Sequence, residues 1–163
     1  MTFSVAPATR ADRREVRRLL AAQFEELEIP VPAARLAAAV DGVFEDAARG
    51  AFLLARLEGR PVGVAYLSYQ WTLEHGGKVA WLEELFVEAG TRSRGLGGRL
   101  LAAACDHARA EGCRAVDLEV ETAHPRAGRL YARAGFTSLD RRRFSRVLPA
   151  PRRRGRPIGG NGR

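Results

Sequence analysis

The sequence contains little cysteine, almost no lysine and no long hydrophobic run. Its 163 residues include two cysteines, Cys105 and Cys113, whose spacing fits neither a zinc site nor a disulfide framework. No window reaches about 18 consecutive apolar residues, which excludes a transmembrane helix, and residues 1–10 lack the apolar core of a secretory signal. We therefore expect a cytoplasmic protein that has no membrane partner and binds no metal.

Acidic residues are missing from the C-terminal end of the chain. Residues 141–163 contain nine arginines and no aspartate or glutamate, whereas the other 140 residues contain 18 basic and 19 acidic side chains. The net charge of +8 therefore comes from the tail and not from the body. Residues 149–163 also hold four glycines and three prolines, a composition that cannot bury a core. We predict one domain over residues 1–148 and a disordered Arg/Gly/Pro-rich tail over 149–163, which could bind polyanions nonspecifically.

The hydrophobic pattern predicts a mixed α/β domain with the order β-α-α-β-β-β-α-β-α-β-β. Asp12, followed three residues later by Glu15, resembles a capping box at the start of the first helix. Two hairpin turns in succession, at 58–60 and 74–77, predict an antiparallel meander, and hence a mostly antiparallel sheet flanked by helices. The expected strands lie at 2–6, 52–57, 62–71, 79–87, 115–120, 136–139 and 144–148. The expected helices follow residue 12 and cover 33–49, 95–111 and 126–134.

A glycine-rich turn joins the fourth expected strand to the third helix. Gly95, Gly97 and Gly98 stand at the helix N-terminus, where backbone N–H groups lack intrahelical partners and the helix dipole is positive. Such a turn predicts a phosphate cradle, to which Arg92 and Arg94 could add charge. The spacing matches neither the P-loop nor the dinucleotide fingerprint. From spacing alone, a turn that only tightens the connection is an equal alternative.

Two motifs together resemble the GNAT superfamily of acetyl-CoA-dependent N-acetyltransferases. The family's pyrophosphate motif, Arg/Gln-x-x-Gly-x-Gly/Ala, is matched by residues 92–97, Arg-Ser-Arg-Gly-Leu-Gly. Its later Asn-x-x-Ala-x-x-Leu-Tyr motif is matched by residues 124–131, except that His124 replaces the usual Asn. Ala89 stands where the family often has proline. Residues 81–87 also look like the corresponding strand of the spermidine/spermine acetyltransferase branch.

The resemblance implies acetyl-CoA as co-substrate and assigns roles to residues of both motifs. Tyr131 would protonate the departing thiolate. Backbone groups of the strand would pair with the pantetheine arm, N–H groups of the glycine turn would bind the pyrophosphate, and the later motif would contact the cofactor arm. The implied cofactor-binding residues are Leu85, Phe86, Val87, Arg92, Ser93, Arg94, Gly95, Leu96, Gly97, Gly98, His124, Ala127 and Tyr131.

Two adjacent carboxylates in an apolar strand are the candidates for the catalytic base. Side chains alternate along a strand, so only one of Glu83 and Glu84 can face the substrate directly. The branch resemblance favours Glu83, acting directly or through water, with Glu84 acting in its place or binding a cation. The alternative is that both are ordinary solvated strand residues.

The sequence leaves the acceptor open. Acidic and aromatic side chains near the expected cleft would suit a cationic small-molecule amine; they are Glu25, Glu26, Glu28, Tyr66, Tyr69 and Trp71. A protein N-terminus or lysine is an alternative acceptor. A nucleic-acid-binding or acetyl-CoA-sensing protein that uses the basic tail is an alternative of another class. A homodimer is expected, since such domains commonly dimerise.

Overall fold

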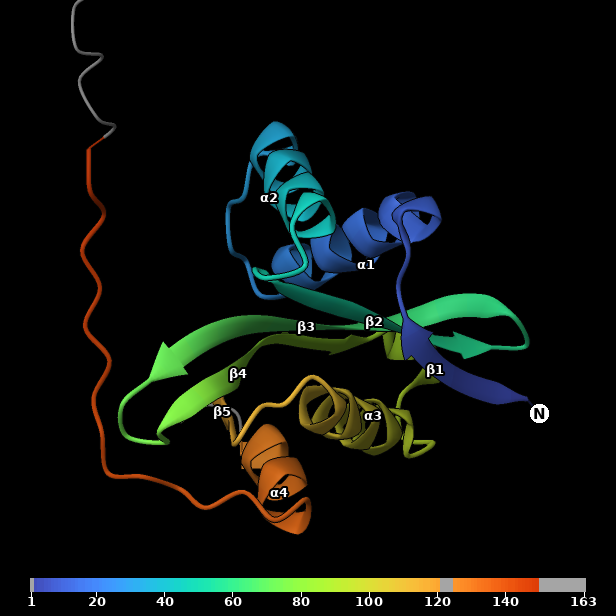
Figure 1. The fold of residues 1–163 in the computed structure, drawn as a ribbon. Helices are drawn as coiled ribbons and strands as arrows, with labels where there is room; N and C mark the ends of the chain where they lie inside the picture. Colours follow the sequence, from blue (N-terminus) through green and yellow to red (C-terminus); the bar gives the residue numbers. More distant parts are fainter. Residues whose placement is uncertain (1, 121–124, 150–163) are drawn as a thin grey trace, which may run out of the picture.

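The computed structural model describes residues 2–120 and 125–149 (Figure 1). Its elements are β1 (Phe3–Pro7), α1 (Arg13–Glu26), α2 (Ala33–Glu45), β2 (Gly50–Leu57), β3 (Arg60–Thr72), β4 (Gly77–Val87), α3 (Leu96–Ala110), β5 (Val116–Leu118) and α4 (Pro125–Arg133). Figure 1 shows the sheet with α1 and α2 on one face and α3 and α4 on the other. No helix in the described ranges is long and apolar enough to cross a membrane.

The strands form one sheet in the order β1-β2-β3-β4-β5. The first three pairings are antiparallel and the last, β4 with β5, is parallel. The predicted fold class, a mostly antiparallel sheet flanked by helices, is therefore confirmed.

The sheet separates two hydrophobic cores, because successive side chains of a strand point to opposite faces. On the α3 face, Leu67 and Leu82 pack with Leu100 and Leu101. On the α1 face, Val64 and Phe86 belong to a second cluster, which also contains Val16, Leu19, Leu20, Val40, Phe52 and Leu54. The two clusters identify the face toward which each strand residue points.

The two last predicted strands are wrong. In the described range 125–149 no strand follows α4, and Phe144 and Val147 are 90% and 93% exposed. β-branched and aromatic residues favour a strand only where a partner strand and a buried surface are available. The segment is instead placed by ion pairs, Arg141 with Glu74 at 2.6 Å and Arg143 with Glu119 at 2.6 Å.

The predicted capping box at Asp12 is also wrong, although α1 begins directly after this residue. The Asp12 carboxylate accepts a hydrogen bond from the Thr9 N–H at 2.8 Å and pairs with Arg56 at 2.6 Å. Glu15 pairs with Arg18 on the helix surface instead of reaching back to Asp12. Asp12 therefore completes a capping box with Thr9, the N-cap residue of the short 3-10 turn before α1, and the Thr9 hydrogen bond is the largest influence that lowers the pKa of Asp12.

Candidate functional site

A β-bulge in β4 brings both candidate carboxylates to the same face of the sheet. Tyr66 of β3 lies opposite Glu84 and Leu67 lies opposite Leu82, so Glu83 is an extra residue in the ladder. An extra residue breaks the alternation of side chains along the strand. The prediction that only one of the two glutamates could face the substrate side is therefore wrong.

Hydrogen bonds of the two carboxylates confirm that both point toward the α1 face. Glu84 accepts a bond from the side-chain amide of Gln23 in α1 at 2.7 Å. Glu83 accepts one from the Ser68 hydroxyl at 2.8 Å. Ser68 lies two residues after Tyr66 on β3, and Tyr66 packs against the α1-side core. The bulge therefore forms a paired-carboxylate site beneath α1.

The two carboxylates differ strongly in environment. Glu83 is exposed, whereas Glu84 is half-buried. Burial raises the pKa of Glu84 to about 7, the neighbouring charge of Glu83 adds to this, and the Gln23 hydrogen bond opposes it. A group with this pKa can both accept and release a proton at neutral pH, as a general base must.

Gln23 is a site residue that the sequence analysis missed. It occupies the buried stripe of α1 with Val16, Leu19 and Leu20, and only 8% of its surface is exposed. One feature of the sequence could have identified it. Gln23 stands at helical spacing within a stripe where only hydrophobic side chains are expected.

The edge of β4 beyond the bulge has no β5 partner within the described residues. β5 pairs only with Ala80, Trp81 and Leu82, while β4 continues to Val87. β4 therefore continues past the last described β5 pairing at the point where the carboxylates lie. The backbone of Leu85–Val87, predicted to pair with pantetheine, lies along this stretch, although the Val87 carbonyl also accepts a bond from Arg92 Nε at 2.7 Å.

The glycine turn leads from the end of β4 into α3 and exposes backbone. Ser93 and Gly95 have positive φ values of 66° and 73°. The Arg99 N–H bonds the Gly95 carbonyl at 3.1 Å and begins the helical ladder, so the N–H groups of residues 96–98 precede it. A Cβ added to Gly95 would meet no atom within 4 Å. The arrangement fits a diphosphate approaching the helix N-terminus.

Arg92 does not point its charge into this turn as predicted. Besides the Val87 carbonyl, its guanidinium binds Glu26 at the end of α1 at 2.6 Å, and it lies 5.5 Å from the centre of the Phe86 ring. The acidic end of α1 draws this side chain away from the helix N-terminus. Arg92 therefore connects α1 to the entry of the turn, while Ser93 and Arg94 remain exposed.

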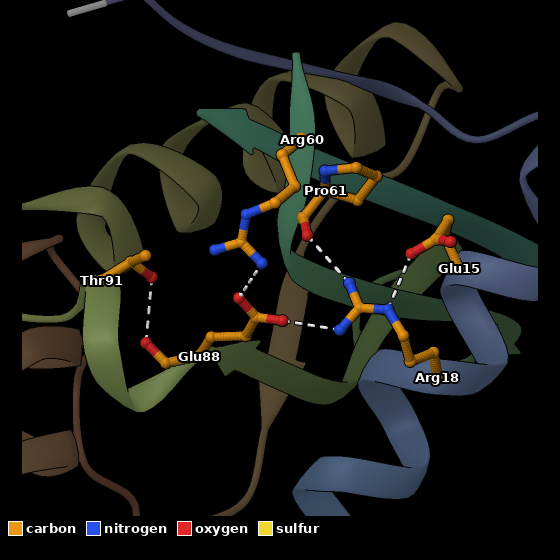
Figure 2. A network of polar contacts seen from close by, with 6 residues as sticks. All are labelled: Glu15, Arg18, Arg60, Pro61, Glu88 and Thr91. Carbon is orange, nitrogen blue, oxygen red and sulfur yellow. Dashed lines mark hydrogen bonds and ion pairs between the residues drawn. The ribbon is translucent and has the colours of Figure 1, made fainter. Parts of the chain in front are cut away.

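Glu88 joins the start of the turn to α1 and β3 (Figure 2). Its carboxylate pairs with Arg18 at 2.6 Å and Arg60 at 2.8 Å, and its carbonyl accepts a bond from the Thr91 hydroxyl at 2.9 Å. Arg18 also binds Glu15 and the Pro61 carbonyl. Burial raises the pKa of Glu88, but the two arginines outweigh burial and lower it. This network anchors the last residue before the turn.

The second predicted motif lies on α4. Tyr131 is half-buried, packs against the α3-side core and forms an edge-to-face contact with Phe136, with ring centres 5.9 Å apart. Burial raises its pKa, so the phenol carries its proton at neutral pH. Ala127 lies in the first turn of α4, and His124 lies outside the described residues.

Residues 13–136 match the Acetyltransferase (GNAT) family. This chain belongs to that family. It is also 33% identical over 90 residues to an uncharacterized N-acetyltransferase of Methanocaldococcus jannaschii; the match covers 55% of this chain and 40% of that relative. The chain thus spans less than half the length of this curated relative.

Two solved structures show how widely the GNAT chain shares its fold. An integron cassette protein from the mobile metagenome of Cole Harbour Salt Marsh superposes with a TM-score of 0.80 at 24% identity, covering 90% of this chain and 91% of that one. The aminoglycoside N-acetyltransferase AAC(6')-Iy in complex with CoA gives a TM-score of 0.77 at 21% identity, covering 90% and 95%. At these identities the likeness establishes the fold.

The predicted acceptor residues of this GNAT domain do not form one cluster. Tyr66 lies opposite Glu84, but Tyr69 packs on the α3 face and contacts His107 at 3.3 Å. Trp71, on the same strand, is 79% exposed. The acidic residues at the end of α1 also separate. Glu26 pairs with Arg92, whereas Glu25 lines a groove of about 630 Å³ between α1 and α2.

Proposed function

We propose that this GNAT protein transfers an acetyl group from acetyl-CoA to a primary amine of a small molecule. Family membership supports the reaction class. The observation that carries the proposal is the half-buried Glu84 with a pKa of about 7, located in the β4 bulge just beyond the last described pairing with β5. A carboxylate of ordinary pKa would be a much weaker base toward an ammonium group, whose pKa is near ~10.4.

The described residues fit acetyl-CoA at two places. The glycine-rich N-terminus of α3, open at Gly95, would hold the diphosphate, and the edge at Leu85–Val87, which has no described β5 partner, would hold the pantetheine amides. The bound acetyl-CoA supplies a thioester carbonyl as the electrophile. The chain itself provides the base, Glu84.

The incoming ammonium group first loses one proton to solvent, which frees the nitrogen lone pair. Glu84 takes the second proton as the new N–C bond forms. The C–S bond breaks, and the Tyr131 hydroxyl donates its proton to the departing sulfur. Tyr131 is protonated at neutral pH because burial raises its pKa. Glu83, exposed beside Glu84, attracts the positive charge of the incoming amine. Glu84 thus replaces Glu83, the residue that the branch resemblance favoured, as the proposed base.

A small amine is the proposed acceptor because Glu84, the proposed base, is half-buried beneath α1 and not on an open surface. A protein N-terminus or lysine is tested in the same assay as an alternative. Homodimer formation, cytoplasmic location and polyanion binding by the tail stay predictions.

Thermal unfolding with and without acetyl-CoA tests the co-substrate. Ligand at roughly 100 times its dissociation constant adds about 2.7 kcal/mol, or on the order of 5–10 °C for a domain of this size. We expect a shift with acetyl-CoA and none with ATP. A panel of small amines and peptides with thiol detection then identifies the acceptor class. No shift at millimolar acetyl-CoA would refute the proposal.

Tyr131→Phe tests the acid. The variant keeps the ring that contacts Phe136 and removes only the donor. We expect kcat to fall about 10²-fold, within the range for general acid catalysis, while acetyl-CoA still shifts the melting temperature. An unchanged kcat would show that the sulfur obtains its proton elsewhere.

A further inference from the structure

Gln23 is the one polar side chain on the buried stripe of α1. Val16, Leu19 and Leu20 of the same stripe are at most 3% exposed, and Gln23 is 8% exposed. An amide is costly to bury unless it is hydrogen-bonded, so hydrophobic packing does not explain its presence.

The amide has a single described hydrogen bond, which goes to the proposed base. Gln23 Nε2 donates to Glu84 Oε2 at 2.7 Å. The other end of the amide, Oε1, is fully buried and has no partner among the residues that the structure describes. The side chain is therefore held by its bond to Glu84.

We propose that Gln23 is the positioning residue of Glu84: its amide N–H fixes the Oε2 atom and leaves Oε1 of the carboxylate for the proton of the acceptor amine. The inference rests on the proposed function in assigning the base role to Glu84. A single donor on Oε2 orients the carboxyl plane and stabilises the ionised form, since hydrogen bonds to charged groups are the strong ones.

Other titratable and charged side chains lie on the elements around Glu84, and of these only Glu83 shifts its pKa. From β4, the charge of Glu83 favours the protonated form. From β3, Tyr66 is held neutral because burial and Glu83 raise its pKa. From α1, Glu26 is neutralised by its ion pair with Arg92. On the C-terminal segment, Arg143 binds Glu119 and also interacts with Glu83. Gln23 is thus the group in direct contact that favours the carboxylate.

Gln23→Met and Gln23→Asn test this role in different ways. Methionine keeps the volume and removes the donor. Asparagine keeps the amide but is one methylene too short for a 2.7 Å contact. Leu20→Met is the matched control, because Leu20 is buried on the same face of α1 and lies in the hydrophobic cluster.

The primary readout is the pKa of Glu84, measured by ¹³C NMR of its side-chain carboxyl and assigned with Glu84→Gln. We expect the pKa to rise by about one unit in both Gln23 variants and to stay constant in the control. In the acetylation assay, the acid limb of the kcat/KM profile should move by the same amount, a roughly tenfold loss at about pH 6.

The two readouts separate failure of the inference from failure of the proposed function. If the Glu84 pKa moves by less than about 0.2 unit in Gln23→Asn, the inference is overturned, whatever the activity. If the pKa rises while the acid limb stays in place, the contact with Gln23 is upheld and Glu84 is not the base. Gln23→Asn keeps the test valid if Gln23→Met does not fold.

Discussion

The β4 bulge places Glu83 and Glu84 in different surroundings, and the two carboxylates therefore differ in chemistry. Glu83 projects toward solvent and hydrogen-bonds Ser68, while Glu84 projects beneath α1 and hydrogen-bonds Gln23. The charge of Glu83 also raises the pKa of Glu84, since two adjacent carboxylates resist ionising together. Glu83 therefore helps to raise the pKa of Glu84 without itself having to accept a proton.

Glu84→Gln should stabilise the fold at high pH while abolishing catalysis. The folded-state pKa of about 7 lies above the ordinary value of 4.5. The protonated form is therefore favoured by folding, and this stabilisation is complete below pH 4.5 and lost as the pH rises through 7. After allowance for partial solvent exposure, the variant should gain about 1–2 kcal/mol over the native chain at about pH 8.

Urea unfolding at about pH 4.5 and pH 8 measures this difference. Glu45→Gln is the control, because this exposed carboxylate at the end of α2 lies outside the site and should change stability by less than about 0.5 kcal/mol at either pH. A gain of equal size at both pH values would mean that the substitution acts through packing and not through ionisation.

At the scale of helices and strands, the features that depend on local periodicity could be predicted from the sequence. The stripe of α1 and the α3 face with Leu100, Leu101 and Ala104 follow helical spacing, and the structure buries them. Hairpin turns at Gly59 and Gly76, both with positive φ, delimit the antiparallel strands. These features depend on residues close together in the chain, and hence can be read without the tertiary structure.

Features set by pairing between distant segments could not be predicted. The bulge at Glu83 depends on the register of β3 against β4, and strict alternation gave the wrong face for one carboxylate. The strand-like residues after α4 lack a described partner strand. Arg92 binds Glu26, a residue 66 positions away, in preference to the turn beside it. In each case a long-range contact overrides local propensity.

Gly95→Ala should weaken acetyl-CoA binding, and Gly112→Ala provides a matched control. The two glycines flank opposite ends of α3, have φ values of 73° and 78°, and would each place a Cβ in open space. The backbone strain of alanine, about 1–2 kcal/mol, should therefore be similar at both sites. Only Gly95 is the N-cap residue of α3, next to the proposed diphosphate site, so the Kd of Gly95→Ala for acetyl-CoA should rise at least about tenfold.

Calorimetric titration of both variants with acetyl-CoA checks this expectation. Melting temperatures should fall equally, which shows that the strain is matched. Equal affinities in the two variants would mean that the glycine turn is not the diphosphate site.

At the scale of the whole molecule, ion pairs join layers that hydrophobic packing leaves separate. Glu88 connects α1, β3 and the turn before α3 (Figure 2). Arg92 connects the same turn to the end of α1. The proposed base contacts α1 through Gln23, and the turn before the proposed diphosphate site contacts it through Glu88 and Arg92. A displacement of α1 would therefore disturb both halves of the reaction together.

Residues 1–140 are nearly neutral, whereas residues 141–163 contain nine arginines and no acidic residue. Residues 150–163 contain five arginines and no acidic residue. Phosphate contacts by arginine give affinity that falls steeply with salt, by a slope of about 0.9 per neutralised phosphate. If the tail alone binds polyanions, its removal should abolish DNA binding and leave the acetylation site intact, because every site residue described above precedes it.

Deleting residues 150–163 should therefore change kcat/KM for a small amine by less than about twofold while removing the salt-dependent binding of duplex DNA. A second variant replaces the five arginines by serine and keeps the length, which separates charge from chain volume. Steady-state kinetics and fluorescence anisotropy at several salt concentrations provide the two readouts. A tenfold loss of acetylation in both variants would place the tail's charge in the acceptor site, and an unchanged DNA affinity would assign polyanion binding to the body.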